Sequence, residues 1–150
     1  MYNHDPVIDA VAVGTRAMLG LTLRSLGPTL EVVTVQQWRV LALLDRLGEL
    51  RLVDIGAQLE SAPPTTSRLV ERLVAKGLID RRVSERSRRE NLMRLTPNGR
   101  QLVGEAKQRR RDAIAELMTS FSDEERAAIG RAAELLTSRL EDELPQSQIL

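Results

Sequence analysis

Arginine side chains are concentrated in one stretch of this 150-residue chain. Residues 61–100 hold ten basic and four acidic side chains, a local net charge of +6, whereas the whole chain carries +1 and the remainder therefore −5. Nine of the ten basic residues are arginine, whose planar guanidinium forms paired hydrogen bonds with phosphate oxygens and guanine edges. A charge run alone is more typical of a solvated surface. The chemistry that this stretch could perform is the neutralisation of nucleic-acid phosphates.

The residue types that most enzymes and metal sites require are scarce. The chain has no cysteine, and its only histidine is His4, close to the first residue. This composition excludes a disulfide framework, a thiol nucleophile and a Cys-ligated zinc site, and it leaves no imidazole for a Ser-His-Asp triad. No glycine-rich phosphate loop is visible either. We therefore expect no enzyme activity, no metal and no cofactor.

Two helical patterns precede the basic stretch. Thr34 and Gln37 form a capping-box pattern, and apolar residues follow it at helical spacing until Gly48. A short helix is expected over residues 52–59. A helix followed closely by a second, basic helix is the arrangement of a helix-turn-helix, in which the second helix enters the DNA major groove.

The second, basic helix is expected over residues 64–76, between a proline pair and Gly77. Its apolar residues Leu69, Val70, Leu73 and Val74 would form the inner face. The polar residues on the rest of its surface are Thr65, Thr66, Ser67, Arg68 and Arg72. Ser61 precedes the helix and could act as its N-terminal cap, because Ala62 has no polar side chain to do so. Ser61 and Ser67 are also candidate DNA contacts.

A β-hairpin is predicted directly after this helix. Residues 78–83 and 92–95 are short and apolar or β-branched near their ends, and the residues between them are polar. The basic residues at the expected tip are Arg86, Arg88 and Arg89. A basic hairpin beside a basic helix makes an ordinary solvated surface the weaker interpretation of the charge.

Long helices are expected at both ends of the chain. The first begins with Asp5 as its cap and ends at Gly27-Pro28, and another runs from Pro97 to about residue 119. A capping box at residues 122–125 begins the last helix, which is expected to end near residue 144. These helices carry more apolar surface than a lone chain of this size could easily hide. The Arg109-Arg-Arg111 run is interpreted as a solvated helix face with i,i+4 partners.

Targeting signals are not apparent. The opening residues, MYNHDPVIDA, lack the basic and apolar regions of a signal peptide, and no apolar run approaches the length of a membrane span. The expectation is a cytoplasmic protein that does not contact a membrane.

The order of these elements resembles the MarR (multiple antibiotic resistance regulator) family of winged helix-turn-helix transcription regulators. Each matching segment is weak alone, and their order and spacing together are specific. The segments are Gln37-Trp-Arg-Val-Leu41, Asp54-Ile-Gly-Ala-Gln-Leu59, Pro64-Thr-Thr-Ser-Arg-Leu-Val70, Leu73-Val-Ala-Lys-Gly-Leu-Ile79, Arg81-Arg82 and Leu95-Thr-Pro-Asn-Gly99.

The resemblance implies a mainly α fold with a small β-hairpin wing, as one MarR-like domain over residues 1–150. Residues 34–96 would form the winged helix-turn-helix lobe that binds double-stranded DNA, and residues 5–33 and 97–145 a helical dimerisation lobe. A homodimer would read a pseudo-palindrome whose half-sites are about 10 bp apart.

The resemblance also assigns roles to residues. Pro64, Thr65, Thr66 and Arg68 match positions that face the major groove, with Arg68 the best candidate for a base contact. Arg72 would contact a backbone phosphate.

In the wing, Arg88 and Arg89 match the basic residues of the family's tip, from which one arginine enters the minor groove. The family's usual wing aspartate is Ser87 here, so Arg86, Arg88 and Arg89 all stay candidates for that contact. Arg51 stands where the third helix often has a threonine cap.

Many relatives release DNA when a small aromatic or phenolic molecule enters the crevice between the two lobes. Residues that could line such a crevice here are Arg16, Met18, Trp38 and Arg39. For Trp38 a place in the core is the stronger interpretation. The peroxide-sensing branch of the family is excluded because it needs a cysteine.

The leading hypothesis is a sequence-specific DNA-binding transcription regulator, a repressor of nearby genes that acts as a homodimer. The alternative is a protein-interaction module on a winged-helix fold that has lost specific DNA binding. The alternative is suggested by Ala62 and Arg51, which replace capping residues, and by Ser87, which replaces the usual wing aspartate. An enzyme is the least favoured class.

Overall fold

The computed structural model describes the backbone of residues 5–83 and 91–143, with side chains up to residue 140. Helices dominate it, and a small antiparallel sheet lies in the middle of the chain, so the predicted mainly α winged-helix fold is confirmed. The elements are α1 (Pro6–Leu30), α2 (Val35–Leu47), β1 (Leu50–Arg51), α3 (Leu52–Gln58), α4 (Pro63–Ala75), β2 (Ile79–Val83), β3 (Asn91–Leu95), α5 (Pro97–Met118) and α6 (Asp123–Glu143).

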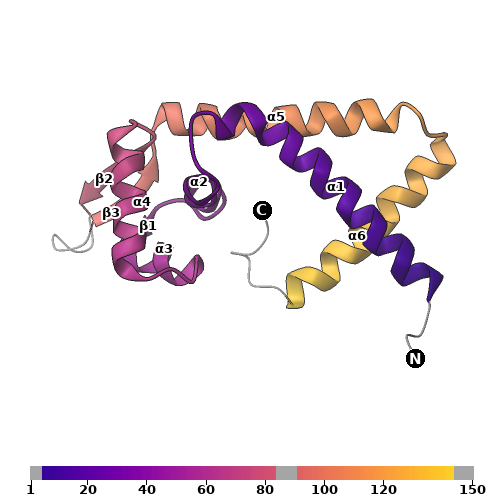
Figure 1. Ribbon diagram of the computed structural model, residues 1–150, viewed down its shortest axis with the longest axis horizontal. Coiled ribbons are helices and arrows are strands. Elements are labelled where there is room, and N and C mark those ends of the chain that lie inside the picture. The colour runs from indigo at the N-terminus through magenta and orange to yellow at the C-terminus, as the bar shows by residue number, and fades with distance from the viewer. Residues whose placement is uncertain (1–4, 84–90, 144–150) are drawn as a thin grey trace.

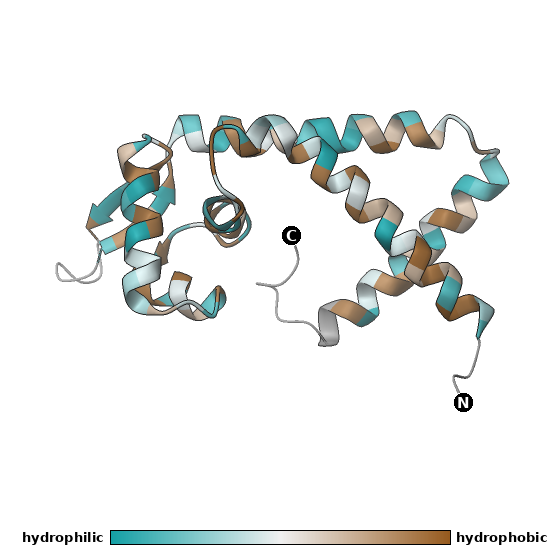
Figure 2. Ribbon diagram, in the orientation of Figure 1, coloured by the Kyte–Doolittle hydropathy of each residue, from teal (hydrophilic) through white to brown (hydrophobic). Residues whose placement is uncertain are grey.

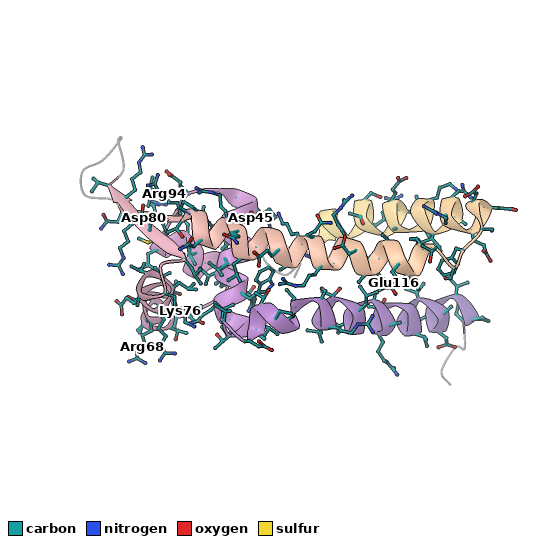
Figure 3. All side chains as sticks on the ribbon, turned by 90° about the horizontal axis from the view of Figure 1, so that it is seen from above. Asp45, Arg68, Lys76, Asp80, Arg94 and Glu116 are labelled. Carbon is teal, nitrogen blue, oxygen red and sulfur yellow. The ribbon has the colours of Figure 1, made fainter. Side chains whose placement is uncertain are left out.

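The elements separate into two regions (Figure 1). The winged lobe, from α2 to β3, lies at one end of the molecule. The terminal helices α1, α5 and α6 extend away from it, and α5 connects the two regions. In Figure 1 α1 and α6 cross, but Figure 3 shows α5 between them, so the two helices are not stacked on each other.

Caps encoded in the sequence begin the helices where they were predicted. Asp5 Oδ1 accepts a hydrogen bond of 2.9 Å from the backbone N–H of Val7. At α2 the capping box is complete, because Thr34 Oγ1 accepts from Gln37 N at 3.2 Å and Thr34 N donates to Gln37 Oε1 at 3.1 Å. The second predicted box forms at Ser122, before α6. Each cap satisfies backbone groups that a helix end leaves without partners.

The sheet contains one strand that the sequence did not reveal. Its order is β1-β3-β2, and Leu50 pairs with Met93 in β3. Strand β1 has only two residues, too few to show the alternation by which strands are recognised. The hairpin was predicted correctly, with Ile79 opposite Leu95 and Val83 opposite Asn91.

The hydrophobic core lies in the winged lobe and against the first half of α5. Its fully buried side chains include Leu41 of α2, Ile55 of α3, Val70 of α4 and Val103 of α5. Trp38 is only 3% exposed and belongs to this core. The helices α2, α3 and α4 are thus held in place by one another.

Helix α1 ends later than expected. It passes through Gly27 and Pro28 to Leu30, and proline is tolerated because it removes only one hydrogen bond close to the helix end. The last turn is held by burial, since Leu26 is 5% and Thr29 0% exposed. Tertiary packing overrides the local stop signal here.

Helix α1 is also long and apolar enough to span a membrane, judged by length and composition alone, with a mean hydropathy of 1.3. The expectation that no apolar stretch reaches this length is therefore wrong. The charged residues Asp9, Arg16 and Arg24 interrupt any continuous run, yet an 18-residue window that begins after Asp9 contains only Arg16 and Arg24.

Candidate nucleic-acid interface

Helix α4 presents two faces of opposite character. Thr66, Val70 and Leu73 recur at i, i+4 and i+7 and are at most 1% exposed, so this stripe fixes α4 against the core. On the opposite side Arg68 and Arg72 are exposed. Figure 3 shows Arg68 directed away from the body of the molecule. The helix is therefore held rigidly by one face and offers guanidinium groups on the other.

Four predicted residues of α4 are partly or fully accessible. Pro64 and Thr65, in the first turn, are exposed beside Arg68 and Arg72. Helix N-termini favour anions because their first backbone N–H groups lack helical partners. This end of α4 therefore combines hydroxyl and guanidinium donors on one accessible surface.

The prediction that Thr66 lies on the outward surface is wrong. Its side chain is 1% exposed, and its Oγ1 donates to the Ala62 carbonyl at 3.3 Å. A methyl group added at Gly56 would meet this Oγ1 at 3.0 Å, so α3 and α4 touch where Thr66 faces α3. The i, i+4, i+7 spacing was the available signal, and it was missed because threonine is polar.

Of the two predicted serines, Ser61 lies before α4 and Ser67 within it. Ser61 does not cap the helix: Ala62 occupies the cap position without a side-chain hydrogen bond, and Ser61 N donates to the Gly56 carbonyl at 2.9 Å. Ser67 is half-buried, and its Oγ donates to Glu71 Oε1 at 3.0 Å. The hydroxyl of Ser67 is thus less available than the outward arginines.

The predicted tip residues of the hairpin, Arg86, Arg88 and Arg89, lie outside the described residues. The base of the hairpin is described and carries an ionic cluster on its outer side. Arg94 donates to Asp80 Oδ2 at 2.8 and 3.2 Å, across directly paired strand positions.

Glu49, which precedes β1, completes this cluster. Its Oε1 lies 3.7 Å from Arg82 and 3.8 Å from Arg94. The hydrogen bond to Asp80 raises the pKa of Arg94 above its ordinary value. Sequence reasoning missed this cluster, although the opposite charges of Asp80 and Arg94 at paired positions are a usable signal. It braces both strands at the described base of the hairpin.

Arg81 and Arg82 are neighbours that face opposite sides of β2. Arg82 joins the ionic cluster, while Arg81 lines a cleft of about 380 Å³ between α4 and the hairpin. Arg51 and Asn91 line the same cleft, which places polar donors between the two basic elements.

Arg51 does not cap α3 through a backbone contact of its side chain. Instead its guanidinium holds Asp54 at 2.7 and 2.9 Å. These side-chain hydrogen bonds lower the pKa of the Asp54 carboxyl below its ordinary value. The pair fixes the start of α3.

The four candidate ligand residues fall into different environments. Arg16 and Met18 are exposed on α1. Trp38 is in the core, as the stronger interpretation of its position predicted, so it is removed from the residues that could line an open crevice. Arg39 is half-buried, and its Nη1 lies 3.4 Å from Gln36 Oε1.

Arg109 is not the solvated side chain that was expected. Its Nε donates to the Ser25 carbonyl at 3.1 Å and its Nη2 to Thr29 Oγ1 at 2.6 Å, so it joins α5 to the end of α1. A distant ion pair with Glu105, four positions earlier, accompanies these hydrogen bonds at 3.9 Å. Sequence periodicity could not show that α1 packs against this face.

The described part of the chain contains no group of side chains suited to bind a metal ion. Within residues 5–83 and 91–140, no three His, Cys, Asp or Glu side chains are grouped to hold an ion. The charged groups of the interface are instead arginines that face solvent or brace neighbouring elements.

Comparisons with known proteins agree with this architecture. The profile of the MarR family matches residues 33–91. A crystal structure of RV1404 from Mycobacterium tuberculosis is 32% identical and has a TM-score of 0.82, covering 92% of this chain and 94% of that one. The HTH-type transcriptional regulator FarR from Neisseria gonorrhoeae is 33% identical over 89 residues, 57% of this chain and 61% of that protein.

The fold is also shared with a MepR variant from S. aureus, whose structure was solved bound to an oligodeoxyribonucleotide. That structure is 23% identical, has a TM-score of 0.69 and covers 91% of this chain and 99% of its own. The profile match, the likeness to RV1404 over nearly the whole chain, the partial match to FarR and the winged-helix fold agree, and this chain belongs to the MarR family of transcription regulators.

Proposed function

We propose that this protein binds duplex DNA sequence-specifically, with α4 in the major groove. The observation that carries the proposal is the two-faced character of α4. A buried stripe of Thr66, Val70 and Leu73 orients the helix, and Arg68 and Arg72 stand exposed on its other side. The DNA-bound MepR structure supports the same use of this fold.

The exposed residues of α4 take different roles. Arg68, one turn from the helix start, reads a guanine edge, because a guanidinium bonds both O6 and N7. Arg72 lies one turn further along and contacts a backbone phosphate. Thr65, at the start of α4, donates its hydroxyl to a phosphate or a base.

The hairpin is proposed as the second DNA contact. One of Arg86, Arg88 and Arg89 enters the minor groove, where narrow A·T stretches concentrate negative potential. The cluster of Glu49, Arg94 and Asp80 at the base supports this role by bracing the strands that carry the tip.

We further propose that two copies form the functional unit. Apolar side chains on α1 and α6 face solvent in the single chain, among them Ile8 at 64% and Leu135 at 66% exposed. A second copy would cover them, and residues 5–33 and 97–145 would form the dimer lobe. The two winged lobes, residues 34–96 of each copy, would read a pseudo-palindrome with half-sites about 10 bp apart.

The regulator is proposed to be a cytoplasmic repressor of nearby genes that a small aromatic or phenolic ligand releases from DNA. Arg16, Met18 and Arg39 stay candidates for lining the ligand site between the lobes. A guanidinium there would pair with an acidic ligand group.

The test is a binding titration with duplexes selected from a random library by the wild-type protein. Arg68→Ala should lose about 5- to 150-fold in its preference for the selected site over random DNA, because a bidentate base contact is worth about 1–3 kcal/mol. Arg131→Ala is the matched control, an exposed arginine on α6. It should change neither affinity nor preference.

Two outcomes would count against the proposal. Retained site preference in Arg68→Ala would remove Arg68 from the base-reading role. Failure of the wild-type protein to bind any duplex at low salt would favour the protein-interaction module instead. Specific binding should also weaken steeply as salt rises, because each neutralised phosphate releases counterions.

A further inference from the structure

A chain of hydrogen bonds runs from the middle of α5 to the far end of α4. It begins at Arg109, whose guanidinium binds Ser25 O and Thr29 Oγ1 at the end of α1. Thr29 is completely buried and Ser25 is 8% exposed, so water does not compete for these acceptors. The α1 end is therefore fixed to α5 by a charged group in a sheltered place.

Thr29 links the fixed end of α1 to the connection between α1 and α2. Its carbonyl accepts hydrogen bonds of 3.0 Å from both Val32 N and Val33 N. Val33 is 2% exposed and packs in the core of the winged lobe. The connection is thus fixed at one end by the terminal helices and at the other by the core.

Lys76 completes the chain. Its ammonium donates to the Val32 carbonyl, and its own backbone N–H closes the last turn of α4 on Arg72 O at 3.0 Å. Lys76 and Arg68 are both labelled on the α4 side of the molecule in Figure 3. The end of α4 that lies away from Pro63 is therefore attached to the α1–α2 connection.

Because α4 is held rigidly in the winged lobe, small tilts of that lobe about this attachment would carry α4 with it and have a large effect on DNA. The helix has 13 residues, so it is about 20 Å long. A tilt of about 10° at the Lys76 end moves the opposite end by roughly 3.4 Å, which is one base-pair step. In a dimer that reads two half-sites, such a movement changes the spacing that fits.

We propose that Arg109 and Lys76 are positioning residues which set the angle of α4 relative to the terminal helices and thereby the half-site spacing that the dimer accepts. Neither residue needs to touch DNA for this role. The inference rests on the proposed function, since it requires a dimer that binds DNA through α4.

The experiment measures affinity for duplexes carrying the selected half-site twice, with the half-site centres about 9 to 12 bp apart. Wild-type protein should show one preferred spacing. Lys76→Met and Arg109→Gln should each reduce that preference by about tenfold, while affinity for a single half-site changes less than about threefold. Lys76→Arg, which keeps a donor, should restore the wild-type profile.

Lys107→Met is the matched control. Lys107 is also a lysine bridge between helices, from α5 to Asp45 of α2, but it lies outside the Arg109–Lys76 chain. This variant should keep the wild-type spacing preference. Circular dichroism should show equal helix content in all variants.

The outcomes separate the two proposals. If Lys76→Met and Arg109→Gln keep the clear spacing preference of the wild-type protein, the positioning role is overturned. The proposal of DNA binding would remain intact in that case. The same loss of preference in Lys107→Met would also overturn it, because any helix bridge would then suffice. A wild-type protein that binds no duplex would refute the proposed function, and the positioning role with it.

Discussion

The winged lobe and the terminal helices differ in how far their apolar side chains are buried. In the winged lobe, side chains such as Leu41, Ile55 and Leu73 are fully buried against one another. Along α1 and α6, residues such as Val7 and Leu135 remain more than 60% exposed. Figure 2 shows hydrophobic residues along both of these helices, far from the sheet. The winged lobe is stabilised by its own chain, whereas the terminal helices have apolar surface left to cover.

The two regions also differ in what their charges do. In the winged lobe, Arg68 and Arg72 face outward from α4, while Arg94 and Arg82 brace the hairpin through Asp80 and Glu49. On α5, Arg109 serves neither purpose and anchors α1. The arginines named here thus divide into those that face solvent and those that join neighbouring elements.

Charge on the apolar stripe of α6 is expected to have the largest effect. Leu136 is 48% exposed and shares a helix face with Ile129 and Leu140. In a two-fold dimer each copy would bury the new carboxylate, at a cost of about 2 kcal/mol per copy. Leu136→Asp should therefore weaken dimerisation by about 1000-fold, measured by sedimentation equilibrium.

Ser138→Asp is the control for this stripe. Ser138 is exposed two positions later, on the opposite face of α6, and its substitution should leave dimerisation unchanged. An equal loss in both variants, or none in Leu136→Asp, would show that this stripe is not where the copies meet. The contrast between the two regions would then need another explanation.

A methyl group at Gly99 is expected to disrupt the junction between α5 and the winged lobe. A Cβ there would lie 2.1 Å from the Leu78 carbonyl, which is backbone and cannot rotate away. Gly99→Ala should lower the free energy of unfolding by about 3 kcal/mol, as overpacking of a rigid site does. Urea unfolding would measure it.

Gly104, on the same helix, is the matched control for Gly99. A Cβ there would meet nothing within 4 Å, so Gly104→Ala should raise stability by up to about 1 kcal/mol through helix propensity. If Gly99→Ala were as stable as Gly104→Ala, the close approach of α5 to Leu78 would be refuted.

Removal of the α2 cap should have a smaller effect. Thr34→Ala abolishes the hydrogen bond that Gln37 N donates to Thr34 Oγ1, and loss of such a cap costs about 1 kcal/mol of unfolding free energy. Thermal unfolding would show it, and Thr34→Ser should recover most of the loss. A wild-type melting temperature in Thr34→Ala would contradict a stabilising role for this capping box.

The Arg51–Asp54 pair should contribute least, and only above acidic pH. Its hydrogen bonds lower the pKa of Asp54 in the folded state, so the stabilisation is present above the unfolded pKa of about 3.9 and is lost as pH falls through the lower folded value. Both groups are exposed, so Asp54→Asn should cost at most about 0.5 kcal/mol at pH 7. Unfolding curves of the variant and the wild type should converge near pH 2–3. A difference that persisted there would assign the effect to something other than this ion pair.

Features that depend on neighbouring residues were predictable from the sequence. The caps at Asp5 and Thr34, the hairpin and the burial of Val70 and Leu73 on α4 all follow from patterns within a few positions. The basic stretch and the order of the elements also sufficed to identify the family. The roles of Arg68 and of the arginines at the hairpin tip stay predictions.

Features that depend on distant elements were not predictable. Thr66 is polar, yet it is buried because Gly56 of α3 lets α4 approach it. Strand β1 exists only because β3 pairs with it. Helix α1 continues past Pro28 because Thr29 is buried and bound by Arg109, a residue 80 positions away.

The sequence by itself therefore determined where the helices begin, where the hairpin lies, where the arginines concentrate and which family the chain resembles, because helix caps and hydrophobic periodicity act over a few residues. Only the tertiary structure decided which of those side chains face outward from α4, which brace the hairpin and which connect the terminal helices to it. The burial of a side chain and the pairing of a strand depend on contacts between elements that are far apart in the sequence. No pattern of neighbouring residues predicts those contacts.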